Sequence, residues 1–510
     1  MREMMKLGHM KLATERPMEN QPVYYIPHHC IEKDDRVVYD ASCKTDTGIS
    51  LNQVQMVGPK LQKDLYETIM RFRRHKIAVY ADIQKMFNQV KLDRQQWDLQ
   101  RIFWRENESE LLREYWLTVV IFGMASSAHL AVRSVMQAAT EQEERLPEAA
   151  KAIKEDFYMD DCVTGSDSVK SAVKLAKQMN EIMIGAGFEL RKWNSNNQRV
   201  RDAMQSDSEK TMLFKEEEES TILGLKWLIE EDQFTFVVKD PKWDREVTKR
   251  TISSHVAQVY DPNGYITPIT IRDIKSVENF RIDRWLSTGK EVSVQLHGFA
   301  DSSTQALGAN VYVRVEDMKG SIKVNLLTTK SRVAPIKTVS LARLELTAAE
   351  LLGRLMKQVK DTMEWQNVEE FLWTDSSVTF YWIRKEPCLL KTYVANRVAS
   401  IQENTKASNW RHVNGTDNPA DLLTRGITPE QLIDNEFWLH GPAWLSKSPS
   451  EWVITRIVGE PPEEAMTEVK ANSITTFREP LCIGIVGTKT KVPLLDYVSQ
   501  ARNQTGARGC

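Results

Sequence analysis

Cysteine is scarce in this sequence, and its six residues are scattered without a CxxC pair. Close cysteine pairs are typical of zinc modules, and dense cysteine is typical of small secreted disulfide scaffolds. No apolar run approaches the roughly 20 residues that span a bilayer, and the first residues lack the apolar core of a signal peptide. These absences argue against a zinc knuckle and an integral membrane protein. They predict a soluble protein of a reducing, intracellular compartment.

Net charge is almost absent too. The 510 residues include 68 basic and 70 acidic side chains, with a formal net charge of −2. A nucleic-acid groove would therefore have to be a local basic surface set against acidic surface elsewhere. The length is sufficient for two to four domains with apolar cores. Composition therefore does not decide whether the protein binds nucleic acid, and the sequence motifs have to be examined.

A pair of adjacent acids, Asp160 and Asp161, stands between two short runs of β character. This pattern predicts a hairpin with the carboxylates at its tip. Adjacent strand residues point to opposite faces, so one aspartate would reach a metal ion fully and its neighbour only in part. Asp82, at the end of the apolar run at residues 77–81, is the candidate for a further acid. Converging carboxylates that hold divalent ions suit phosphoryl transfer, and a plain polar turn is the alternative.

The residues around this pair resemble a known family. Residues 158–161, Tyr-Met-Asp-Asp, resemble the signature of retroelement reverse transcriptases. From about residue 24 to about residue 444, the sequence resembles the Pol polyprotein of BEL/Pao-type long-terminal-repeat retrotransposons. The resemblance implies a polymerase site in which Asp82, Asp160 and Asp161 are catalytic and hold two metal ions.

The resemblance also assigns residues that bind the incoming nucleotide. Arg36 matches the arginine that grips the triphosphate, a task that suits the planar fork of a guanidinium. Its alternative is an exposed strand charge. Phe87, five residues after Asp82, matches the aromatic residue that collides with a ribose 2′-hydroxyl. Its alternative is simple core packing, since apolar residues are usually just buried.

Three further residues take substrate-binding roles from the same resemblance. Gly123 lies in the loop that supports the templating base pair, where a glycine permits close backbone approach. Tyr158 precedes the acid pair. Lys192, on the strand after the hairpin, would donate a proton to the pyrophosphate leaving group, and a solvated strand lysine is its alternative.

The C-terminal half contains a second acidic pattern. Asp301 follows a β-like run, Glu345 lies in a predicted helix, Asp375 ends another apolar run, and Asp421 comes last. This order resembles the ribonuclease H domain, in which four carboxylates bind two magnesium ions that activate water against an RNA phosphodiester. Glu350, about one helical turn after Glu345, is the alternative for the helix position.

Two further features have more than one interpretation. Many ribonucleases H place a mobile histidine before the last acid, and His412 lies slightly too early for a firm match. A predicted helix ends in the cationic segment at residues 71–76. Those cations would either favour the helix dipole or contact backbone phosphates.

The fold class predicted from the resemblance is a multidomain α+β and α/β protein. A right-hand polymerase of fingers and palm at residues 1–230 is followed by a shortened thumb and connection at 231–292. A ribonuclease H-like α/β domain at 293–426 and a C-terminal tail at 427–510 complete the chain. The connection is shorter than the family pattern, so we expect low processivity. Neither a His/Cys zinc module nor a third acidic triad indicates an integrase.

The function predicted is that of a retrotransposon RNA-directed DNA polymerase with ribonuclease H endonuclease activity, using two Mg²⁺ ions per site or Mn²⁺ in their place. Expected partners are an RNA or DNA template, a primer strand, dNTPs, an RNA:DNA hybrid and other Pol or Gag products, but no membrane. The expected location is a cytoplasmic virus-like particle, with nuclear entry on the pathway to DNA integration. The alternatives are a decayed or domesticated copy that binds nucleic acid without polymerising, or a chain in which only the ribonuclease H half works.

Overall fold

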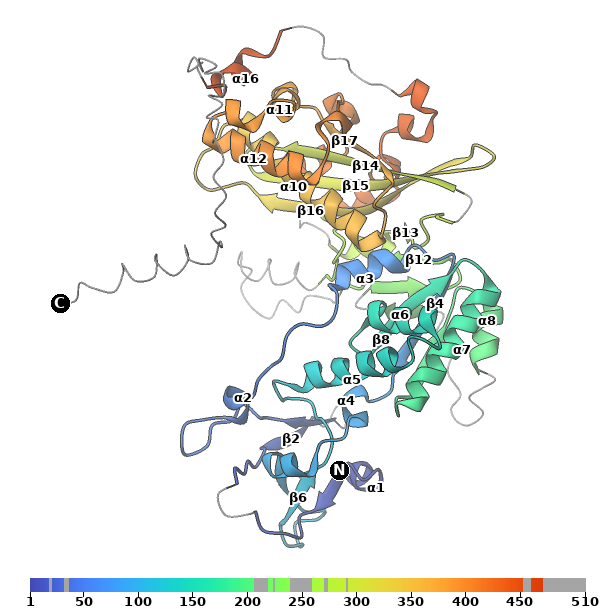
Figure 1. Ribbon diagram of the computed structural model, residues 1–510, viewed down its shortest axis with the longest axis vertical. Coiled ribbons are helices and arrows are strands. Elements are labelled where there is room, and N and C mark those ends of the chain that lie inside the picture. Colours follow the sequence, from blue (N-terminus) through green and yellow to red (C-terminus); the bar gives the residue numbers. More distant parts are fainter. Residues whose placement is uncertain are drawn as a thin grey trace, which may run out of the picture. The chain divides into compact units, whose positions relative to one another are not determined.

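The computed structural model describes most of the chain (Figure 1). The described residues are 1–17, 21–31, 36–205, 219–222, 225–238, 259–269, 274–289, 292–452 and 460–470. Residues 1–468 form one compact unit, and the second unit, residues 469–510, lies almost wholly outside the described residues. None of the described helices is long and apolar enough to cross a membrane.

The N-terminal part is a small β structure. Strands β1 (Met10–Leu12), β6 (Arg113–Leu117) and β5 (Arg101–Trp104) form an antiparallel sheet, and β2 (His28–Ile31) pairs with β3 (Arg36–Tyr39). Two short helices, α1 (Arg2–Lys6) and α2 (Leu51–Val54), accompany them. Apolar residues of both sheets share one core cluster.

A four-stranded antiparallel sheet in the order β7-β8-β4-β9 supports the first acidic pair. Its strands are β7 (Phe157–Tyr158), β8 (Asp161–Ser166), β4 (Ile77–Ile83) and β9 (Leu190–Asn194). In β4, Ile77 and Val79 pack into one apolar cluster while Ala78 and Tyr80 pack into another. Because both faces of β4 are covered, its sequence is a continuous apolar run rather than an alternating one.

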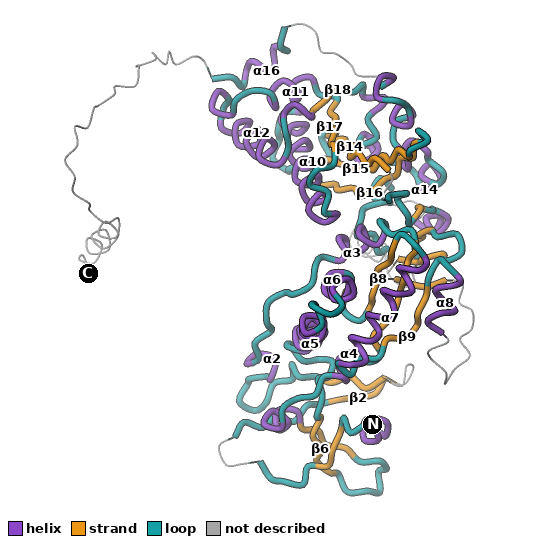
Figure 2. The backbone as a smooth tube through the Cα atoms, turned by 45° about the vertical axis from the view of Figure 1, so that its right-hand side comes forward, coloured by secondary structure: helices purple, strands orange, loops and turns teal. Residues whose placement is uncertain are grey.

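Helices cover this sheet (Figure 2). They are α3 (Leu65–Phe72), α4 (Met86–Gln89), α5 (Ser127–Glu141), α6 (Pro147–Glu155), α7 (Val169–Gly185) and α8 (Gln198–Gln205). Helix α7 contacts β4 and β8, and α5 and α6 pack against it. The apolar stripe that predicts an amphipathic helix after the hairpin is buried in α7 from Ala172 to Met183, so that prediction is confirmed.

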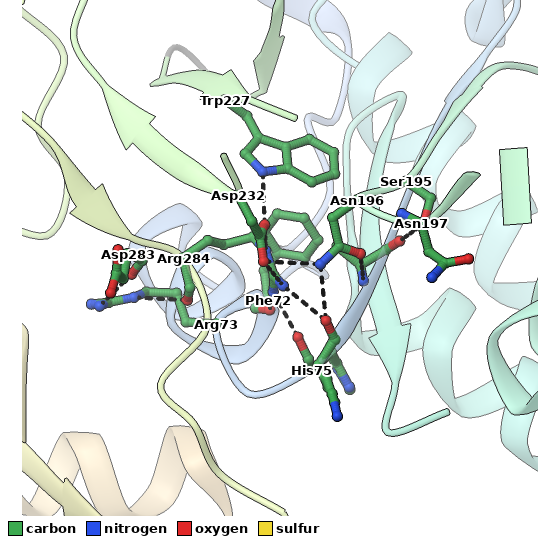
Figure 3. A network of polar contacts seen from close by, with 12 residues as sticks. Phe72, Arg73, His75, Ser195, Asn196, Asn197, Trp227, Asp232, Asp283 and Arg284 are labelled. Carbon is green, nitrogen blue, oxygen red and sulfur yellow. Dashed lines mark hydrogen bonds and ion pairs between the residues drawn. The ribbon is translucent and has the colours of Figure 1, made fainter. Parts of the chain in front are cut away.

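A fourth sheet in the order β10-β11-β12-β13 follows. Its strands are β10 (Glu219–Ile222), β11 (Leu225–Leu228), β12 (Gln233–Thr235) and β13 (Ile282–Asp283). Figure 3 shows how buried polar groups join it to the end of α3. The Arg284 guanidinium binds both carboxylate oxygens of Asp232 at 2.5 and 2.7 Å, and it donates to the carbonyls of Phe72 and His75 at 2.8 Å. One arginine thus donates to two carbonyls at and just beyond the end of α3, where helix carbonyls have no partner within the helix.

Arg73 makes the next connection. Its fully buried guanidinium donates to the carbonyls of Asp283 at 2.8 Å and Leu326 at 2.7 Å, and to the Tyr265 hydroxyl at 3.0 Å. Arg71 is buried as well and pairs with Asp156 at 3.2 Å. The phosphate-binding interpretation of the cationic segment is therefore wrong for these two arginines, which serve packing instead.

The last sheet has the order β16-β15-β14-β17-β18. Its strands are β14 (Val292–Ser302), β15 (Ala306–Asp317), β16 (Ile322–Val333), β17 (Glu369–Thr374) and β18 (Trp410–His412). The first three strands are antiparallel, while β17 and β18 join in parallel after crossovers through helices. Helix α10 (Leu341–Met363) packs on one face of β14 and β15, and α11 (Ser377–Ile383) and α12 (Thr392–Asn404) pack beside it. Helix α13 (Asp421–Arg425) contacts the same two strands from the other face.

The region predicted as a C-terminal tail contains packed structure. Helices α14 (Pro429–Leu432) and α15 (Glu436–His440) come first, and α16 (Glu463–Thr467) follows later. Trp438, Trp444 and Trp452 are buried in the same core cluster as Phe299 and Trp373 of the sheet. Residues up to 452 therefore contribute to the core of the ribonuclease H-like sheet.

Two candidate active sites

Strand pairing brings the first three acids together. Asp82 on β4 lies directly opposite Asp161 on β8, and the Ile83 N–H donates to the Asp160 carbonyl at 2.8 Å. Tyr158 pairs with Asp161 across a tight hairpin whose turn residue Met159 has a φ of 55°. Asp160 is exposed at this tip. The predicted juxtaposition of the hairpin acids with Asp82 is therefore present.

The Asp161 carboxylate is the most perturbed of the three. Burial raises its pKa to about 6, and the nearby charges of Asp160 and Asp82 act in the same direction. The Tyr80 hydroxyl donates to Asp161 Oδ1 at 2.8 Å and opposes this rise. Tyr80 is a site residue that the sequence did not single out, because it lies within an apolar strand.

Lys192 reaches the site through an irregularity in strand pairing. Between the pairs Tyr80–Asn194 and Asp82–Arg191, β9 has one residue more than β4, and Lys192 has a φ of 52°. Such a bulge re-aims a side chain. The Lys192 ammonium lies 2.8 Å from Asp82 Oδ2, and this hydrogen bond raises the pKa of Lys192.

Phe87 and Gly123 have packing partners. Phe87 on α4 is buried and meets Phe122 edge to face, with ring centroids 4.4 Å apart. Gly123 has a φ of 94°, and a Cβ there would lie 2.2 Å from the Tyr39 carbonyl oxygen. This close approach is to the chain's own backbone on β3, and it explains why a glycine is needed there. The predicted roles toward substrate stay predictions for both residues.

Arg36 and Tyr158 are placed only in part. Arg36 lies on β3 opposite Ile31, but its side chain is outside the described part of the structure, as is all of Lys33. Tyr158 ends β7 beside the acid pair and is half-buried. Their predicted contacts with a nucleotide stay predictions.

The second set of acids gathers at one end of the last sheet. Asp301 lies near the end of β14, Asp375 directly follows β17, and these two strands run side by side in parallel. Glu345 lies in the first turns of α10, and Asp421 begins α13. Parallel neighbours bring the ends of β14 and β17 to the same edge of the sheet, as their order in the sequence requires.

These carboxylates influence one another. Burial raises the pKa of Asp301 to about 6 and that of Glu345 to about 7, and the charge of Asp375 adds to both shifts. Burial also raises the pKa of Asp375, with the charge of Asp421 acting in the same direction. Neutral donors reach Asp301 and Glu345, namely the hydroxyls of Thr424 and Ser376 and the Ser302 backbone N–H. The fourth acid, Asp421, pairs with Arg425 at 2.7 Å.

The structure distinguishes the two glutamates of α10. Glu350 accepts a hydrogen bond from Arg354 at 2.5 Å and lies 3.7 Å from Arg397. Its charge is therefore compensated by two guanidiniums. Glu345 instead faces the acids of the site, so the structure places Glu345 rather than Glu350 in the cluster.

His412 and Asn418 lie beside the same cluster. His412 on β18 has Nε2 2.9 Å from the Asp375 carbonyl oxygen, which can only accept, so Nε2 carries the proton. The Asn418 amide donates to the Ala300 carbonyl at 3.0 Å. Asn418 belongs to the Asn-Pro-Ala-Asp segment that ends in Asp421, so its role in positioning that segment could have been inferred from the sequence.

A family model decides the class of the second region. Residues 270–376 match the Pao retrotransposon-like RNaseH-like domain. This region is therefore similar to the Pao-type RNaseH-like domain. The match includes Asp301, Glu345 and Asp375, and it confirms the predicted relation to BEL/Pao-type Pol. A search of the curated proteins finds no match.

Solved structures show the fold of most of the chain. A foamy viral protease-reverse transcriptase in complex with double-stranded DNA has a TM-score of 0.51 and 14% identity, over 81% of this chain and 67% of the other. A second foamy viral structure, with an RNA/DNA hybrid, has a TM-score of 0.47 and 13% identity, over 84% and 54%. The first likeness shows the reverse transcriptase fold, which confirms the predicted fold class. With the RNaseH-like match, it places the chain in an enzyme class.

The residues of both sites suit a hard divalent cation. Among the described residues, no three His, Cys, Asp or Glu side chains form a ready-made metal cage. Mg²⁺, however, is usually held by one or two carboxylates together with waters and substrate phosphates. The pKa values of these acids are raised by burial and by one another's charges, so a bound cation would stabilise their ionised forms, and carboxylate oxygens are the ligands that Mg²⁺ prefers. The carboxylates of the first site (Asp82, Asp160 and Asp161) and those of the RNaseH-like domain therefore fit Mg²⁺.

Proposed function

We propose that this chain is an RNA-directed DNA polymerase that also hydrolyses the RNA strand of an RNA:DNA hybrid. The observation that carries the proposal is the presence of two separate acidic sites, each assembled from distant segments. The pairing of Asp82 with Asp161 supports the polymerase site, and the convergence of Asp301, Glu345 and Asp375 supports the ribonuclease H site.

At the first site, Asp82, Asp160 and Asp161 would hold Mg²⁺, which stabilises the charge that develops on the oxygens during nucleotidyl transfer. Tyr80 fixes the orientation of the Asp161 carboxylate through its hydroxyl. Lys192 holds Asp82 in place and neutralises part of the negative charge of the first site. Because the pair with Asp82 raises the pKa of Lys192, this lysine is a poor proton donor while the pair is intact.

At the second site, Asp301, Glu345, Asp375 and Asp421 would hold Mg²⁺, which activates water against the phosphodiester of RNA. Thr424 and Ser376 orient Asp301 and Glu345 through their hydroxyls. The carboxylates have to be ionised to bind a cation, so their raised pKa values predict a loss of cleavage at acidic pH.

We extend the nucleic-acid partners to this chain by analogy with the foamy viral protein, whose structure contains double-stranded DNA. The proposed partners are an RNA or DNA template, a primer, dNTPs and an RNA:DNA hybrid, together with other Pol and Gag products. Arg36, Phe87, Gly123 and Tyr158 are proposed nucleotide contacts. The proposed location is a cytoplasmic virus-like particle, with nuclear entry before DNA integration.

A primer-extension assay on an RNA template tests the first activity. We expect extension by the parent chain that requires Mg²⁺, and none by Asp160→Asn. Duplex binding without any extension by the parent would favour the alternative of a domesticated copy that only binds nucleic acid.

An RNA:DNA hybrid cleavage assay tests the second activity separately. We expect Asp375→Asn to lose cleavage and to keep primer extension, because the two sites share no acid. Equal cleavage by Asp375→Asn and the parent would remove the assignment of the second site. Cleavage without extension in the parent would support the alternative in which only the ribonuclease H half works.

A further inference from the structure

A short segment near the C-terminus, residues 460–468, packs on the RNaseH-like domain far beyond the matched family region. We call it the strap. It contains the short helix α16 and ends at Glu468. Ala465 is fully buried and Glu468 is 9% exposed, although the segment is mostly polar. Burial of this kind in a short polar segment points to a specific docking position.

Backbone groups of the strap are bound by α11 and by the residue that precedes α12. The buried Trp382 indole N–H donates to the Ala465 carbonyl at 2.9 Å. The Lys391 N–H donates to the Glu468 carbonyl at 2.8 Å. These two bonds fix both the middle and the end of the strap.

A charged contact joins the strap to α10. The Arg343 guanidinium donates through Nε and Nη2 to Glu468 Oε1, at 3.0 and 2.6 Å. The Glu468 side chain is 11% exposed and the Arg343 side chain 36%, so water reaches this contact mainly from the arginine side. Arg343 also lies over the Tyr393 ring, 5.0 Å from its centroid, which restricts the guanidinium further.

These contacts adjoin the second acidic site. Arg343 precedes Glu345 by two residues on α10, and α11 starts two residues after Asp375. The strap therefore joins the element that carries Glu345 to the element that follows Asp375. Glu464 of the strap is near enough for its charge to contribute to the raised pKa of Glu345.

We propose that the strap is a positioning element of the second acidic site, in which Glu468 acts through Arg343 to hold α10 against α11. The distance between Glu345 and Asp375 depends on the relative position of these helices, so the strap sets the geometry in which both acids can share a cation. This inference rests on the proposed ribonuclease H function. It makes Glu468 and Arg343 positioning residues, since neither belongs to the acid cluster itself.

The test compares Glu468→Gln with the parent in the full chain. Residues that support metal ligands typically contribute about 10-fold to 100-fold to metal affinity or activity. We expect hybrid cleavage to fall about 10-fold and the Mg²⁺ concentration for half-maximal cleavage to rise, while the KM for the hybrid stays the same. Primer extension by the same protein should be unchanged and shows that the variant is folded. Glu460→Gln, at an exposed position of the strap, is the matched control.

Two further variants separate positioning from general stability. Trp382→Phe keeps an aromatic ring but removes the indole N–H that binds the Ala465 carbonyl, so it should shift the Mg²⁺ dependence in the same direction. The charge exchange Arg343→Glu with Glu468→Arg should restore part of the activity that either change alone removes. Cleavage by Glu468→Gln equal to that of the parent would overturn the proposal. Increased cleavage would overturn it too, because the strap would then be a cover over the site.

A thermal-shift titration with Mg²⁺ alone gives a readout without turnover. We expect the parent to be stabilised at lower Mg²⁺ concentration than Glu468→Gln. A parent that does not cleave hybrid refutes the proposed function, whereas identical titration curves of parent and variant refute the strap. The two failures are therefore distinguishable.

Discussion

The first acidic site and the second acidic site differ in how the chain assembles them. Asp82 and Asp161 are cross-strand neighbours in one sheet, so backbone pairing alone fixes their separation. Asp301, Glu345 and Asp375 come from two strands and a helix, and their arrangement depends on how α10 and α11 pack. A site whose acids are fixed by strand pairing should tolerate changes in helix packing. A site whose acids come from strands and a helix should depend on the contacts that hold those elements together.

The two sites also differ in how their charge is balanced. At the first, Lys192 pairs with Asp82, and Tyr80 donates to Asp161. At the second, only neutral donors reach Asp301 and Glu345, while Arg425 pairs with Asp421 at 2.7 Å. Neutral donors offset less of the cost of a buried charge than a cation does. Asp301 and Glu345 should therefore depend more on a bound metal ion than Asp82 does.

The largest effect is expected from a matched pair of substitutions on α10. Glu345→Gln should lower hybrid cleavage at least about 100-fold, because it removes a carboxylate from the reacting centre. Glu350→Gln changes the same residue type about one turn away, where the charge is held by Arg354 and Arg397. It should leave cleavage within a few-fold of the parent, as measured by initial rates. A stronger loss in Glu350→Gln would reverse the assignment.

The buried network in Figure 3 should respond next. Arg284→Met leaves Asp232 without its guanidinium and removes donors from the carbonyls of Phe72 and His75. Breaking such a buried pair costs about 3–5 kcal/mol of unfolding free energy, measurable by urea denaturation.

The control for this change is Glu230→Gln, which breaks the more accessible pair with Arg201. The Glu230 side chain is 64% exposed, so the loss should stay below about 1 kcal/mol. Equal urea midpoints for the two variants would show that the network contributes little.

The pH dependence of stability tests whether the charges of Asp301 and Glu345 are poorly compensated in the metal-free protein. The pKa values of Asp301 and Glu345, about 6 and about 7, lie above their ordinary values of 3.8 and 4.5. Between these limits the folded protein binds more protons than the unfolded chain, so stability falls as pH rises from about 4 to about 7. We expect the metal-free protein to show a lower melting temperature at pH 8 than at pH 5. Added Mg²⁺ should reduce this difference.

A variant identifies which group causes the pH dependence of the melting temperature. Glu345→Gln cannot ionise at this position, so its metal-free melting curve should depend less on pH than that of the parent. A parent whose metal-free stability rises through this range would contradict the stated environment of Asp301 and Glu345.

The smallest effect is expected at Lys192. Its side chain is 62% exposed, and exposed ion pairs contribute about 1 kcal/mol or less. Lys192→Gln should therefore slow primer extension less than about tenfold, since 1.4 kcal/mol corresponds to a factor of ten. A loss of about 100-fold or more would instead indicate general acid catalysis by Lys192. Single-turnover extension with correct nucleotide measures the difference, with Arg191→Gln as a control on the same strand.

Sequence reasoning reached the acids because their signals are local. Asp160 and Asp161 sit at a hairpin that β propensity predicts, and Asp82 ends a fully apolar run that becomes β4. The helix stripe from Ala172 to Met183 gave α7 in the same way. Each of these patterns depends on neighbours within a few residues, where spacing determines which side chains share a face.

By itself, therefore, the sequence determined which acids this protein has, their order, and the elements that carry them. Only the tertiary structure decided which glutamate of α10 joins the second cluster, that Arg73 and Arg284 are buried, and that residues 460–468 dock beside Arg343. These outcomes depend on partners tens to hundreds of residues away. A charged side chain becomes a ligand, a packing group or a surface group according to which partners and how much water surround it, and the chain settles both only when it folds.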